Sequence, residues 1–432
     1  MRHSFFLLRR FSSAATLNFG IMCKYPSLSE ANVTKALHED RGSDAHLVSW
    51  VTEDFLGEGD NYASAVTSVK VEYTHGGETH DVSYIVKLKR KRDGGSPTYF
   101  DNMTFEKEAR FLTEICPLLN AELLAAGLTP LRVPRCCHNA VSENQDYLFL
   151  EDLRHKGFRR YDRKKGIDYL HAKLVLQELA RLHAASFLLR KRKEEDMVTK
   201  HKFLTWEWHN YSDEARKEFQ TLFAGTQNST SALAAVMGYE SLSRWFKNTA
   251  SRGCEFVEEQ LDRSKFDVIC HGDCFTSNIL FRYNEEGLPV EVVLLDLQIC
   301  RVSSLAIDLN YFIFSSIPRS ERNELEEYLS LYHSSFMRVM SAAGCDMPFT
   351  KDEISQEFKR KNTYGFVFAS ILIPILVSEA QDVLEFDSAT DGRAKDFVEE
   401  LRQNAMRMLA SNRLLKPRLK DLFDDIVEFQ EL

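Results

Sequence analysis

The sequence lacks any apolar run long enough to cross a lipid bilayer. Its longest candidate, residues 366–377, falls well short of the roughly 20 residues that a membrane-spanning helix needs, and reads better as a buried helix. A basic excess is also missing, because 64 aspartates and glutamates outnumber 55 lysines and arginines and leave a formal net charge of −9. A general nucleic-acid binder needs a basic surface that neutralises phosphates. We therefore expect no membrane span and no nucleic-acid partner.

The nine cysteines follow no regular metal-binding pattern. Cys270 and Cys274 flank one polar turn, so a zinc site there is an alternative, but a second C-x2-C pair is missing. An odd number of cysteines without a disulfide framework is typical of reduced thiols, which favours an intracellular protein.

Acidic residues are absent before Glu30. The arginines and serines at positions 9–13 resemble part of a transit peptide, whereas the apolar run before them is too short for a secretory signal. A further alternative is that translation starts at Met22. We expect a cytoplasmic location, with a mitochondrial location as the alternative if residues 1–28 are a leader.

The most informative stretch is residues 268–298, in which each polar group lies at one end of a predicted strand. An apolar strand leads into Asp273, Asn278 follows after four intervening residues, and a hairpin returns to Asp296. In kinase-fold phosphotransferases one aspartate accepts the proton of the attacking hydroxyl, and an asparagine and a second aspartate hold Mg²⁺ on the nucleotide phosphates. The alternative is that these residues only cap turns. The spacing favours a kinase that uses ATP and Mg²⁺, with Asp273 catalytic and Asn278 and Asp296 as metal ligands.

Two segments of this stretch, CHGDCFTSNILF and LLDLQ, resemble the ecdysteroid kinase-like family. That family belongs to a superfamily with the choline kinases and the aminoglycoside phosphotransferases. The resemblance implies an α+β, bilobal, protein-kinase-like fold with a small β-rich N-terminal lobe and a larger helical C-terminal lobe. We divide the chain into a leader or disordered segment (1–28), a nucleotide-binding lobe (29–152), and a lobe with the catalytic loop, metal site and acceptor pocket (153–432).

Lys87 lies in a predicted strand, at the place where kinase folds put the lysine that contacts the α- and β-phosphates. Lys89 shares its face because strand side chains alternate, and the resemblance favours Lys87; the alternative is a solvated strand lysine. In the predicted helix 105–116, at about 100° per residue, Glu108 lies in the middle of the apolar face. A carboxylate there is costly unless it is paired. We therefore expect an ion pair between Glu108 and Lys87, with a backbone amide or water at the lobe edge as the alternative partner.

Residues 57–64 lie where a loop would cover the nucleotide. Gly59, Asn61 and Ser64 are candidate phosphate contacts. The segment departs from G-x-G-x-x-G because Tyr62 takes the third glycine position, so a plain β-turn is the alternative.

The resemblance implies that a hinge follows the strand 146–150 and contacts the adenine through its backbone, and Glu151 is our candidate there. His183, on a predicted long helix 169–190, is expected to be a packed, hydrogen-bonded core residue. Asp308 is expected to anchor the catalytic loop.

The stretch after Asp296 has no room for the activation segment and A-P-E anchor of a protein kinase, which favours a small-molecule acceptor. Residues 202–265, which are rich in aromatic side chains, are expected to form part of its pocket, with packing in the core as the alternative for the tryptophans. The resemblance implies an ecdysteroid-like or other lipophilic alcohol, as in detoxification. Alternatives are a choline or aminoglycoside-type acceptor, or an inactive kinase-fold binding protein; a metal-dependent hydrolase lacks further ligands at sensible spacing. We expect a monomer.

Overall fold

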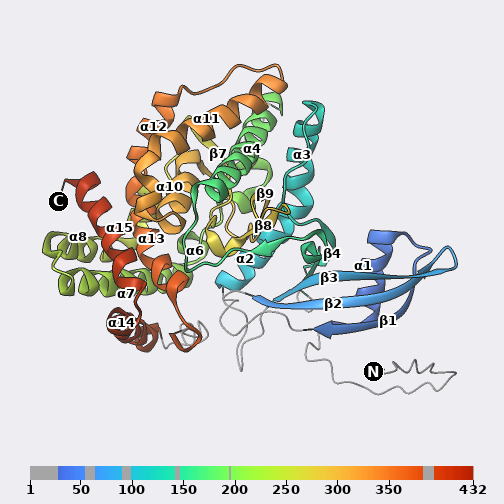
Figure 1. Ribbon diagram of the computed structural model, residues 1–432, viewed down its shortest axis with the longest axis horizontal. Helices are drawn as coiled ribbons and strands as arrows, with labels where there is room; N and C mark the ends of the chain where they lie inside the picture. The colour runs from blue at the N-terminus through green and yellow to red at the C-terminus, as the bar shows by residue number, and fades with distance from the viewer. Residues whose placement is uncertain are drawn as a thin grey trace, which may run out of the picture.

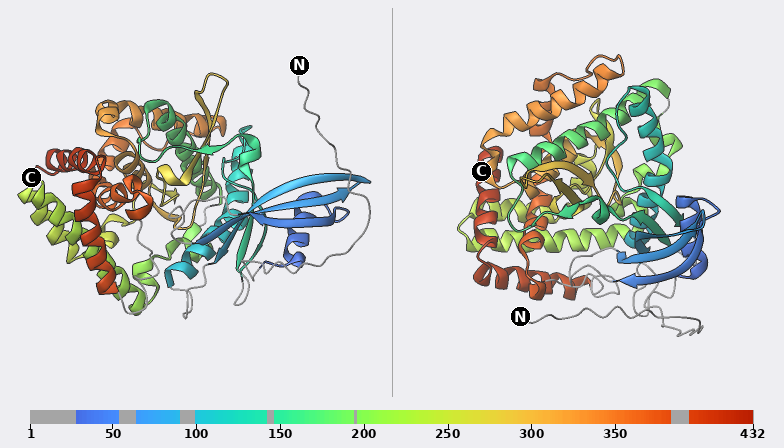
Figure 2. Two further views of the ribbon diagram at one scale, coloured as in Figure 1. Left: turned by 60° about the horizontal axis from the view of Figure 1, so that its bottom comes forward. Right: turned by 45° about the vertical axis from the view of Figure 1, so that its right-hand side comes forward.

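The computed structural model describes residues 28–53, 64–89, 99–141, 146–193, 196–382 and 394–431. An antiparallel sheet lies at one end of the molecule, at the right of Figure 1, and a larger helical part forms the rest. Figure 2 shows from a second side that the long strands project away from the helical part. The expected α+β architecture, with a small β-rich N-terminal part and a larger helical C-terminal part, is confirmed.

The sheet has five strands in the order β1-β2-β3-β5-β4. Their bounds are β1 His46–Glu53, β2 Ser64–His75, β3 Glu78–Lys89, β4 Cys136–Ala140 and β5 Tyr147–Glu151. The hairpin between β2 and β3 closes through Gly76 and Gly77, which have φ of 60° and 86°. Two successive positive φ values are what a two-residue hairpin turn needs, and glycine adopts them without steric cost. The predicted strands that carry Lys87 and residues 146–150 are present as β3 and β5, and β4 was not predicted.

The two faces of the sheet carry different partners. Helix α1 (Glu30–Arg41), capped by the Ser29 side chain, packs against one face, where Val33 and Leu37 join the same apolar core as Val69 and Val86. Leu148 and Leu150 of β5 belong instead to the main core of the protein. Side chains alternate along a strand, so Lys87 points away from the α1 face and toward the rest of the molecule.

The predicted helix 105–116 is longer and less regular than expected. Helix α2 (Tyr99–Arg110) runs into a π-helical turn, η1 (Phe111–Ile115), and then into α3 (Cys116–Ala125). Single π turns change the register of a helix face and are frequent near functional sites. Here the π turn begins three residues after Glu108.

The C-terminal part consists mostly of helices, and two small sheets cross it. One sheet pairs β7 (Asp267–Cys270) with β10 (Arg301–Ser304), and the other has the order β6-β8-β9. The strands of the second sheet are β6 Arg159–Arg160, β8 Ile279–Tyr283 and β9 Pro289–Leu294. Strands β7, β8 and β9 were expected, and β10 was not. The helical segments are η2 Leu153–Lys156, α4 Tyr169–Lys193, α5 Met197–Lys200, η3 Lys202–Thr205, α6 Trp208–Tyr211, α7 Asp213–Val236, α8 Glu240–Ala250, α9 Gly253–Gln260, η4 Thr276–Asn278, α10 Leu305–Ser316, η5 Arg319–Glu324, α11 Leu325–Ala342, α12 Lys351–Arg360, α13 Asn362–Val377, η6 Ala380–Asp382, α14 Ala394–Ser411 and α15 Leu415–Gln430.

Helices α10 and α13 lie side by side in the centre of this part. All twelve residues of α10 are buried. The apolar run at 366–377 lies in α13, and most of its side chains are buried, as the sequence indicated. Among the helices that the structure describes, none is both long enough and apolar enough to cross a membrane.

Gly365 allows α13 to approach α10 closely. A Cβ atom at this position would lie 2.8 Å from both the Cβ atom and the carbonyl oxygen of Asn310. We therefore predict that Gly365→Ala lowers the free energy of unfolding by about 1–3 kcal/mol, because two backbones must move apart. Lys359→Ala, on the exposed face of α12, is the control. Equal midpoints in chemical denaturation for the two variants would contradict this account of the helix contact.

Candidate active site

Asp273, Asn278 and Asp296 come together because three strands end at one place. Asp273 lies in the turn after β7, Asn278 immediately precedes β8, and Asp296 follows β9. The Asn278 amide nitrogen donates to the backbone oxygen and to the Oδ2 atom of Asp273, at 3.0 Å in both cases. Strands β8 and β9 pair from Ile279 to Leu294, so the hairpin between them returns the chain to the same edge. The three side chains predicted from spacing therefore form one cluster.

Two residues that sequence reasoning did not identify complete the surroundings of Asp273. The hydroxyl of Tyr311, on α10, donates to Asp273 Oδ1 at 2.7 Å, and the Gln298 amide donates to Oδ2 at 3.3 Å. Burial, together with the nearby Asp273 carboxylate, raises the pKa of Tyr311 well above its ordinary value, so this hydroxyl remains a donor. Gln298 lies two residues after Asp296. This closeness in the chain could have predicted that Gln298 lies near the cluster. Tyr311 had no such signal, because only the folding of α10 against the loop brings it to Asp273.

Lys87 joins the sheet to this cluster. Its Nζ atom lies 2.8 Å and 2.9 Å from the two carboxylate oxygens of Glu108, so the ion pair expected from the helix periodicity is present. The same ammonium group contacts Asp296. Lys89, the alternative on the same face, pairs with Asp146 at 2.6 Å. The structure therefore distinguishes the two lysines, which strand alternation alone could not do.

Asp296 has an unusual backbone conformation. Its φ is 61°, in the left-handed region that residues with a Cβ rarely occupy. Such strained conformations persist where the surrounding structure requires them. Here the conformation turns the chain sharply after β9, and the carboxylate, whose side chain is 30% exposed, reaches Lys87.

The turn before Asp273 is built around Gly272 and Asp308. Gly272 has a φ of 85°, and a Cβ atom there would clash with the carbonyl oxygen of Ile299. The Asp308 carboxylate accepts hydrogen bonds from the backbone N–H groups of His271 and Gly272 at 2.6 Å and 2.8 Å. Asp308 therefore anchors the loop, as its position in the sequence suggested.

Burial alone would raise the pKa of Asp308, but the hydrogen bond and the charge of His183 outweigh it and leave the pKa below its usual value. His183 donates or accepts through both ring nitrogens, at 2.8 Å from the Tyr332 hydroxyl and 3.0 Å from Asp308. It is a packed core residue, as expected. Its contact with Asp308 connects the long helix α4 to the loop that carries Asp273.

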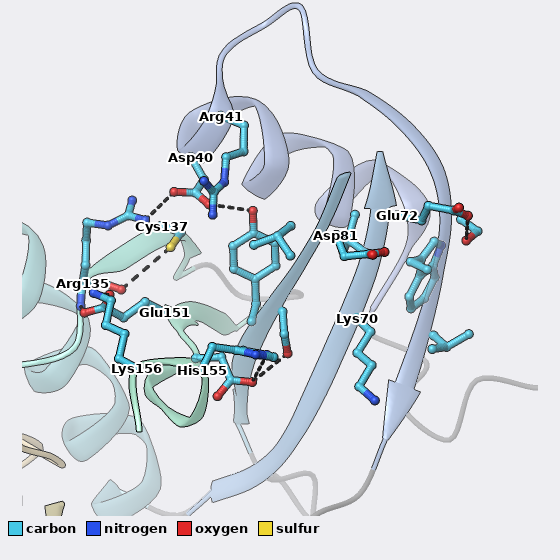
Figure 3. A pocket seen from close by; sticks show the side chains of 18 residues that line it. Asp40, Arg41, Lys70, Glu72, Asp81, Arg135, Cys137, Glu151, His155 and Lys156 are labelled. Atoms are coloured by element: carbon cyan, nitrogen blue, oxygen red, sulfur yellow. Dashed lines mark hydrogen bonds and ion pairs between the residues drawn. The ribbon is translucent and has the colours of Figure 1, made fainter. Parts of the chain in front are cut away.

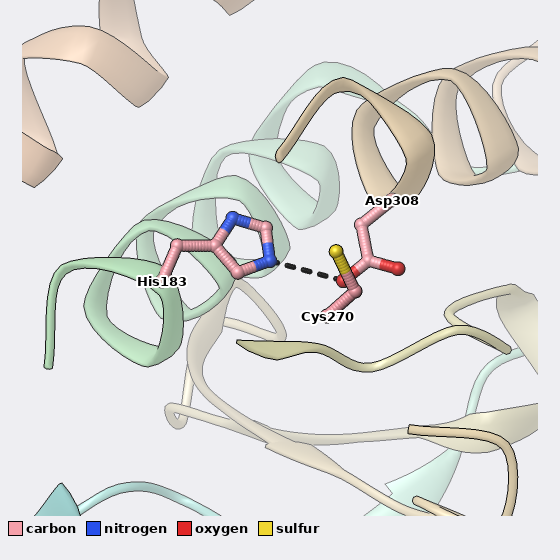
Figure 4. A group of neighbouring side chains, drawn as sticks. All are labelled: His183, Cys270 and Asp308. Atoms are coloured by element: carbon pink, nitrogen blue, oxygen red, sulfur yellow. Dashed lines mark hydrogen bonds and ion pairs between the residues drawn. The ribbon is translucent and has the colours of Figure 1, made fainter. Parts of the chain in front are cut away.

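His183, Cys270 and Asp308 lie close enough together to resemble a metal site (Figure 4). The atoms that would bind a metal are already engaged, because both nitrogens of His183 and both oxygens of Asp308 have hydrogen-bond partners. Burial raises the pKa of the Cys270 thiol well above its ordinary value, so the thiolate that would bind a metal is disfavoured. Cys274, the other half of the possible zinc pair, is not part of this group. We interpret the three side chains as structural.

An apolar floor lies beside the cluster and was not predicted. Leu280 and Leu295, one on β8 and one after β9, are only partly buried and pack against Leu153, Phe158 and Val293. Leu153 lies two residues after the end of β5. A partly exposed apolar surface between the lobes, next to Asp296, suits the flat face of a nucleobase.

The candidate nucleotide contacts of the N-terminal part are Gly59, Asn61, Ser64 and Glu151. Gly59 and Asn61 lie outside the described residues, and of Ser64 only the backbone, at the start of β2, is described. The Glu151 carboxylate accepts from Arg135 N–H at 3.1 Å and from Lys156 at 2.7 Å. Its side chain is therefore engaged outside the cluster, and only its backbone stays a candidate for hinge contacts.

A cavity of about 730 Å³ lies against the sheet (Figure 3). It is lined by α1, by strands β1 to β3 and by the chain after β5, including Asp40, Tyr84, Arg135 and Glu151. Its main charges pair with one another: Arg135 with Asp40, and Lys156 with Glu151. Lys87 and Asp296 do not line it, so it is separate from the cluster described above.

The cluster has the donors that a magnesium ion requires. Mg²⁺ prefers oxygen ligands and is usually held by one or two carboxylates and by phosphates. The Asn278 amide nitrogen is used toward Asp273, which leaves its amide oxygen for a cation. Asp296 already pairs with a cationic group, the Lys87 ammonium. Asn278 and Asp296 are therefore the residues that could hold the metal.

The bilobal fold and this arrangement place the protein among the kinase-like phosphotransferases that act on a hydroxyl group of a small molecule. Within that class the chain belongs to the ecdysteroid kinase-like family, whose sequence model matches residues 58–345, more than half of the 432 residues. A comparison with curated protein sequences finds no match.

Several solved structures are distantly similar. An ethanolamine kinase from Plasmodium vivax has 11% identity and a TM-score of 0.39, with 83% of this chain and 84% of that chain covered. The choline kinase LicA from Streptococcus pneumoniae has 13% identity and a TM-score of 0.34, with 87% and 99% covered. An APH(2")-IIIa aminoglycoside phosphotransferase, in a complex with GDP and kanamycin, has 12% identity and a TM-score of 0.36, with 87% and 98% covered. The family assignment does not depend on them.

Asp308→Asn tests the anchor of the catalytic turn. The substitution replaces an acceptor oxygen by an N–H group that faces a backbone N–H, so we expect the free energy of unfolding at pH 7 to fall by about 3 kcal/mol or more. Because the native pKa of Asp308 is below its unfolded value, its contribution is present above about pH 4 and is lost as the pH falls through the native pKa.

Urea unfolding of the wild type and of Asp308→Asn between pH 7 and pH 3 measures this contribution. The difference in free energy of unfolding between the two proteins should become smaller as the pH falls toward 3. A difference that stays constant over this range would show that the carboxylate charge does not support the turn.

Proposed function

We propose that the protein transfers the γ-phosphoryl group of Mg²⁺-bound ATP to the hydroxyl group of a lipophilic alcohol, of the ecdysteroid type or similar to it, so that a phosphate ester forms and ADP leaves. The observation that carries the proposal is the contact of Lys87 with both Glu108 and Asp296. This contact joins the lysine that would hold the phosphates to the carboxylate that would hold the metal. Phosphoryl transfer depends on such positioning of charges more than on covalent catalysis.

Asp273 holds the acceptor hydroxyl and accepts its proton. Its orientation is set by Tyr311 on one carboxylate oxygen and by Asn278 and Gln298 on the other. A carboxylate oxygen can accept more than one hydrogen bond, so Asp273 retains capacity for the acceptor. Three donors lower the freedom of the carboxylate and reduce the reorganisation that proton transfer requires.

Lys87 contacts the α- and β-phosphates, and Glu108 holds the lysine in place. Asn278 and Asp296 are the metal ligands, and a bound Mg²⁺ neutralises charge on the phosphates. The nucleobase lies against Leu280 and Leu295, with backbone groups near Glu151 as its polar contacts. Gly59, Asn61 and Ser64 stay candidate phosphate contacts from the sequence.

An aromatic surface beside Asp273 supports a lipophilic acceptor. The rings of Phe275 and Phe368 lie 6.4 Å and 5.9 Å from the Tyr311 ring, centroid to centroid, and both are only partly buried. Phe368 and Leu261 connect this surface to a second apolar group around Phe223, on α7. Part of the segment 202–265, expected to contribute to the pocket, lies here.

Aromatic rings also bind quaternary ammonium groups such as that of choline, so this surface alone does not separate choline from a lipophilic alcohol. An aminoglycoside-type acceptor fits less well, because its several ammonium groups need acidic side chains that are free to pair with them. Asp262, the acid next to Leu261, already pairs with Lys361 and Arg360. Glu258, one turn before it, pairs with Arg216 at 2.6 Å.

Asp296→Asn tests the metal assignment. The variant keeps the size of the side chain, so we expect an unchanged far-UV circular dichroism spectrum and a loss of phosphate transfer of at least about a hundredfold. Thermal unfolding with Mg²⁺-ATP, with and without EDTA, should show a metal-dependent stabilisation in the wild type only. Normal transfer rates in Asp296→Asn would show that Asp296 does not hold the metal.

The acceptor is tested by incubating the protein with γ-labelled ATP and a panel of steroid alcohols, xenobiotic alcohols, choline and an aminoglycoside. Label should pass to lipophilic alcohols, and Asp273→Asn should transfer at least about a hundredfold less label while it still binds nucleotide. Phe368→Ala should raise KM for the alcohol about tenfold and leave KM for ATP unchanged. Transfer to choline or the aminoglycoside alone would overturn the lipophilic assignment.

A further inference from the structure

A second group of charges connects the lobes, apart from the pair of Lys87 and Glu108. Lys107, on α2, donates to the backbone oxygen of Trp206 at 2.6 Å and lies 3.9 Å from the Glu207 carboxylate. Glu207 also pairs with Arg301 at 2.8 Å, at the start of β10. Arg301 in turn donates to the Tyr364 hydroxyl at 2.8 Å. One carboxylate thus bridges two cations from different lobes.

These charged side chains are buried, so each needs a partner of opposite charge for the folded state to be stable. The Lys107 side chain is fully buried, and those of Arg301 and Glu207 are 7% and 13% exposed. Burial lowers the pKa of Lys107, and Glu207 acts in the opposite direction. Removing one partner of such a group leaves a charge without compensation in a region of low polarity. Glu207 is therefore the member on which both cations depend.

Each cation of this group is next to a residue of the active site. Lys107 precedes Glu108 in α2, and because consecutive helical residues point about 100° apart, the two side chains fix the rotation of the helix from two directions. Arg301 follows Asp296 by five residues and pairs in the sheet with Cys270, just before the turn that carries Asp273. The group therefore supports the segments that carry Glu108 and Asp296, the two carboxylates in contact with Lys87.

Aromatic contacts hold the same segment against α2. The guanidinium of Arg110 lies 4.3 Å from the centroid of the Phe203 ring, and the Phe100 and Trp208 rings are 4.6 Å apart. Arg110 also pairs with Glu114, which contacts His201 at 3.1 Å. Residues 201–208 thus lie along the side of α2. Within this segment, Glu207 is the residue whose carboxylate pairs with Lys107 of α2.

We propose that Glu207 is a positioning residue for phosphoryl transfer. Through Lys107 it holds α2 in the rotation that keeps Glu108 on Lys87, and through Arg301 it holds the chain after Asp296. The pair of Lys87 and Glu108 is then formed before any substrate binds. This inference rests on phosphoryl transfer by the site and does not depend on which alcohol is the acceptor.

Kinetics of Glu207→Gln, Glu108→Gln and the double variant test the inference, with ATP and the alcohol that the wild type accepts. Glu207→Gln should lower kcat about tenfold, and it should cause little further loss in the Glu108→Gln background, because both act through Lys87. Glu399→Gln, which breaks an exposed pair with Arg402 on the same lobe, is the matched control and should keep the wild-type kcat. An equal loss from Glu207→Gln with and without Glu108 would mean a purely structural role and would overturn the proposal.

Hydrogen–deuterium exchange gives a readout that needs no activity. Peptides from 99–110 should exchange faster in Glu207→Gln than in the wild type, while peptides from α4 should not change. Glu207→Asp keeps the charge and tests the same point if Glu207→Gln does not fold. The exchange rate of its 99–110 peptides should lie between those of the wild type and Glu207→Gln. Wild-type exchange over 99–110 in a folded variant would also overturn the proposal. A wild type that neither binds nucleotide nor transfers phosphate would instead refute the proposed function, whatever the exchange shows.

Discussion

The contact of Lys87 with two carboxylates, Glu108 and Asp296, is the interaction on which the architecture of the site depends. One carboxylate belongs to α2 and the other follows the last strand of the C-terminal hairpin. The ammonium group is largely buried and is held by both carboxylates, since a buried charge without a partner is strongly unfavourable. The relative position of the sheet, α2 and the hairpin is thereby restricted to an arrangement that brings the phosphate-binding and metal-binding groups together.

A network of hydrogen-bonded groups holds the turn that carries Asp273. Asp308 accepts from two backbone N–H groups of the turn and is itself held by His183, which contacts Tyr332. Gly272 permits the close approach of this turn to Ile299. Asp273 can remain in one orientation because the backbone that carries it cannot easily move. The same logic applies to α2, where the helix that carries Glu108 is held on its other side by Glu207.

Sequence reasoning was accurate where local periodicity and local spacing contain the information. The buried position of Glu108 follows from its place in the apolar face of a helix, and the Asp273–Asn278 spacing follows from one turn between two strands. The strands β4 and β10 were missed because they are short and form by pairing with other strands, β5 and β7, and not through a periodic pattern of their own. The π turn after α2 was missed because its residues are ordinary helix formers.

The sequence by itself determined the types of the reacting groups, their order along the chain and the family to which the chain belongs, since these depend on residues close together in the chain. The tertiary structure alone decided which lysine meets Glu108, that Tyr311 and Gln298 orient Asp273, that Leu280 and Leu295 form an apolar floor, and that Glu207 bridges the lobes. The physical reason is distance along the chain. Contacts such as Lys87 with Asp296 join residues more than 200 positions apart, and no local pattern records which of many charged residues will meet once the core has formed.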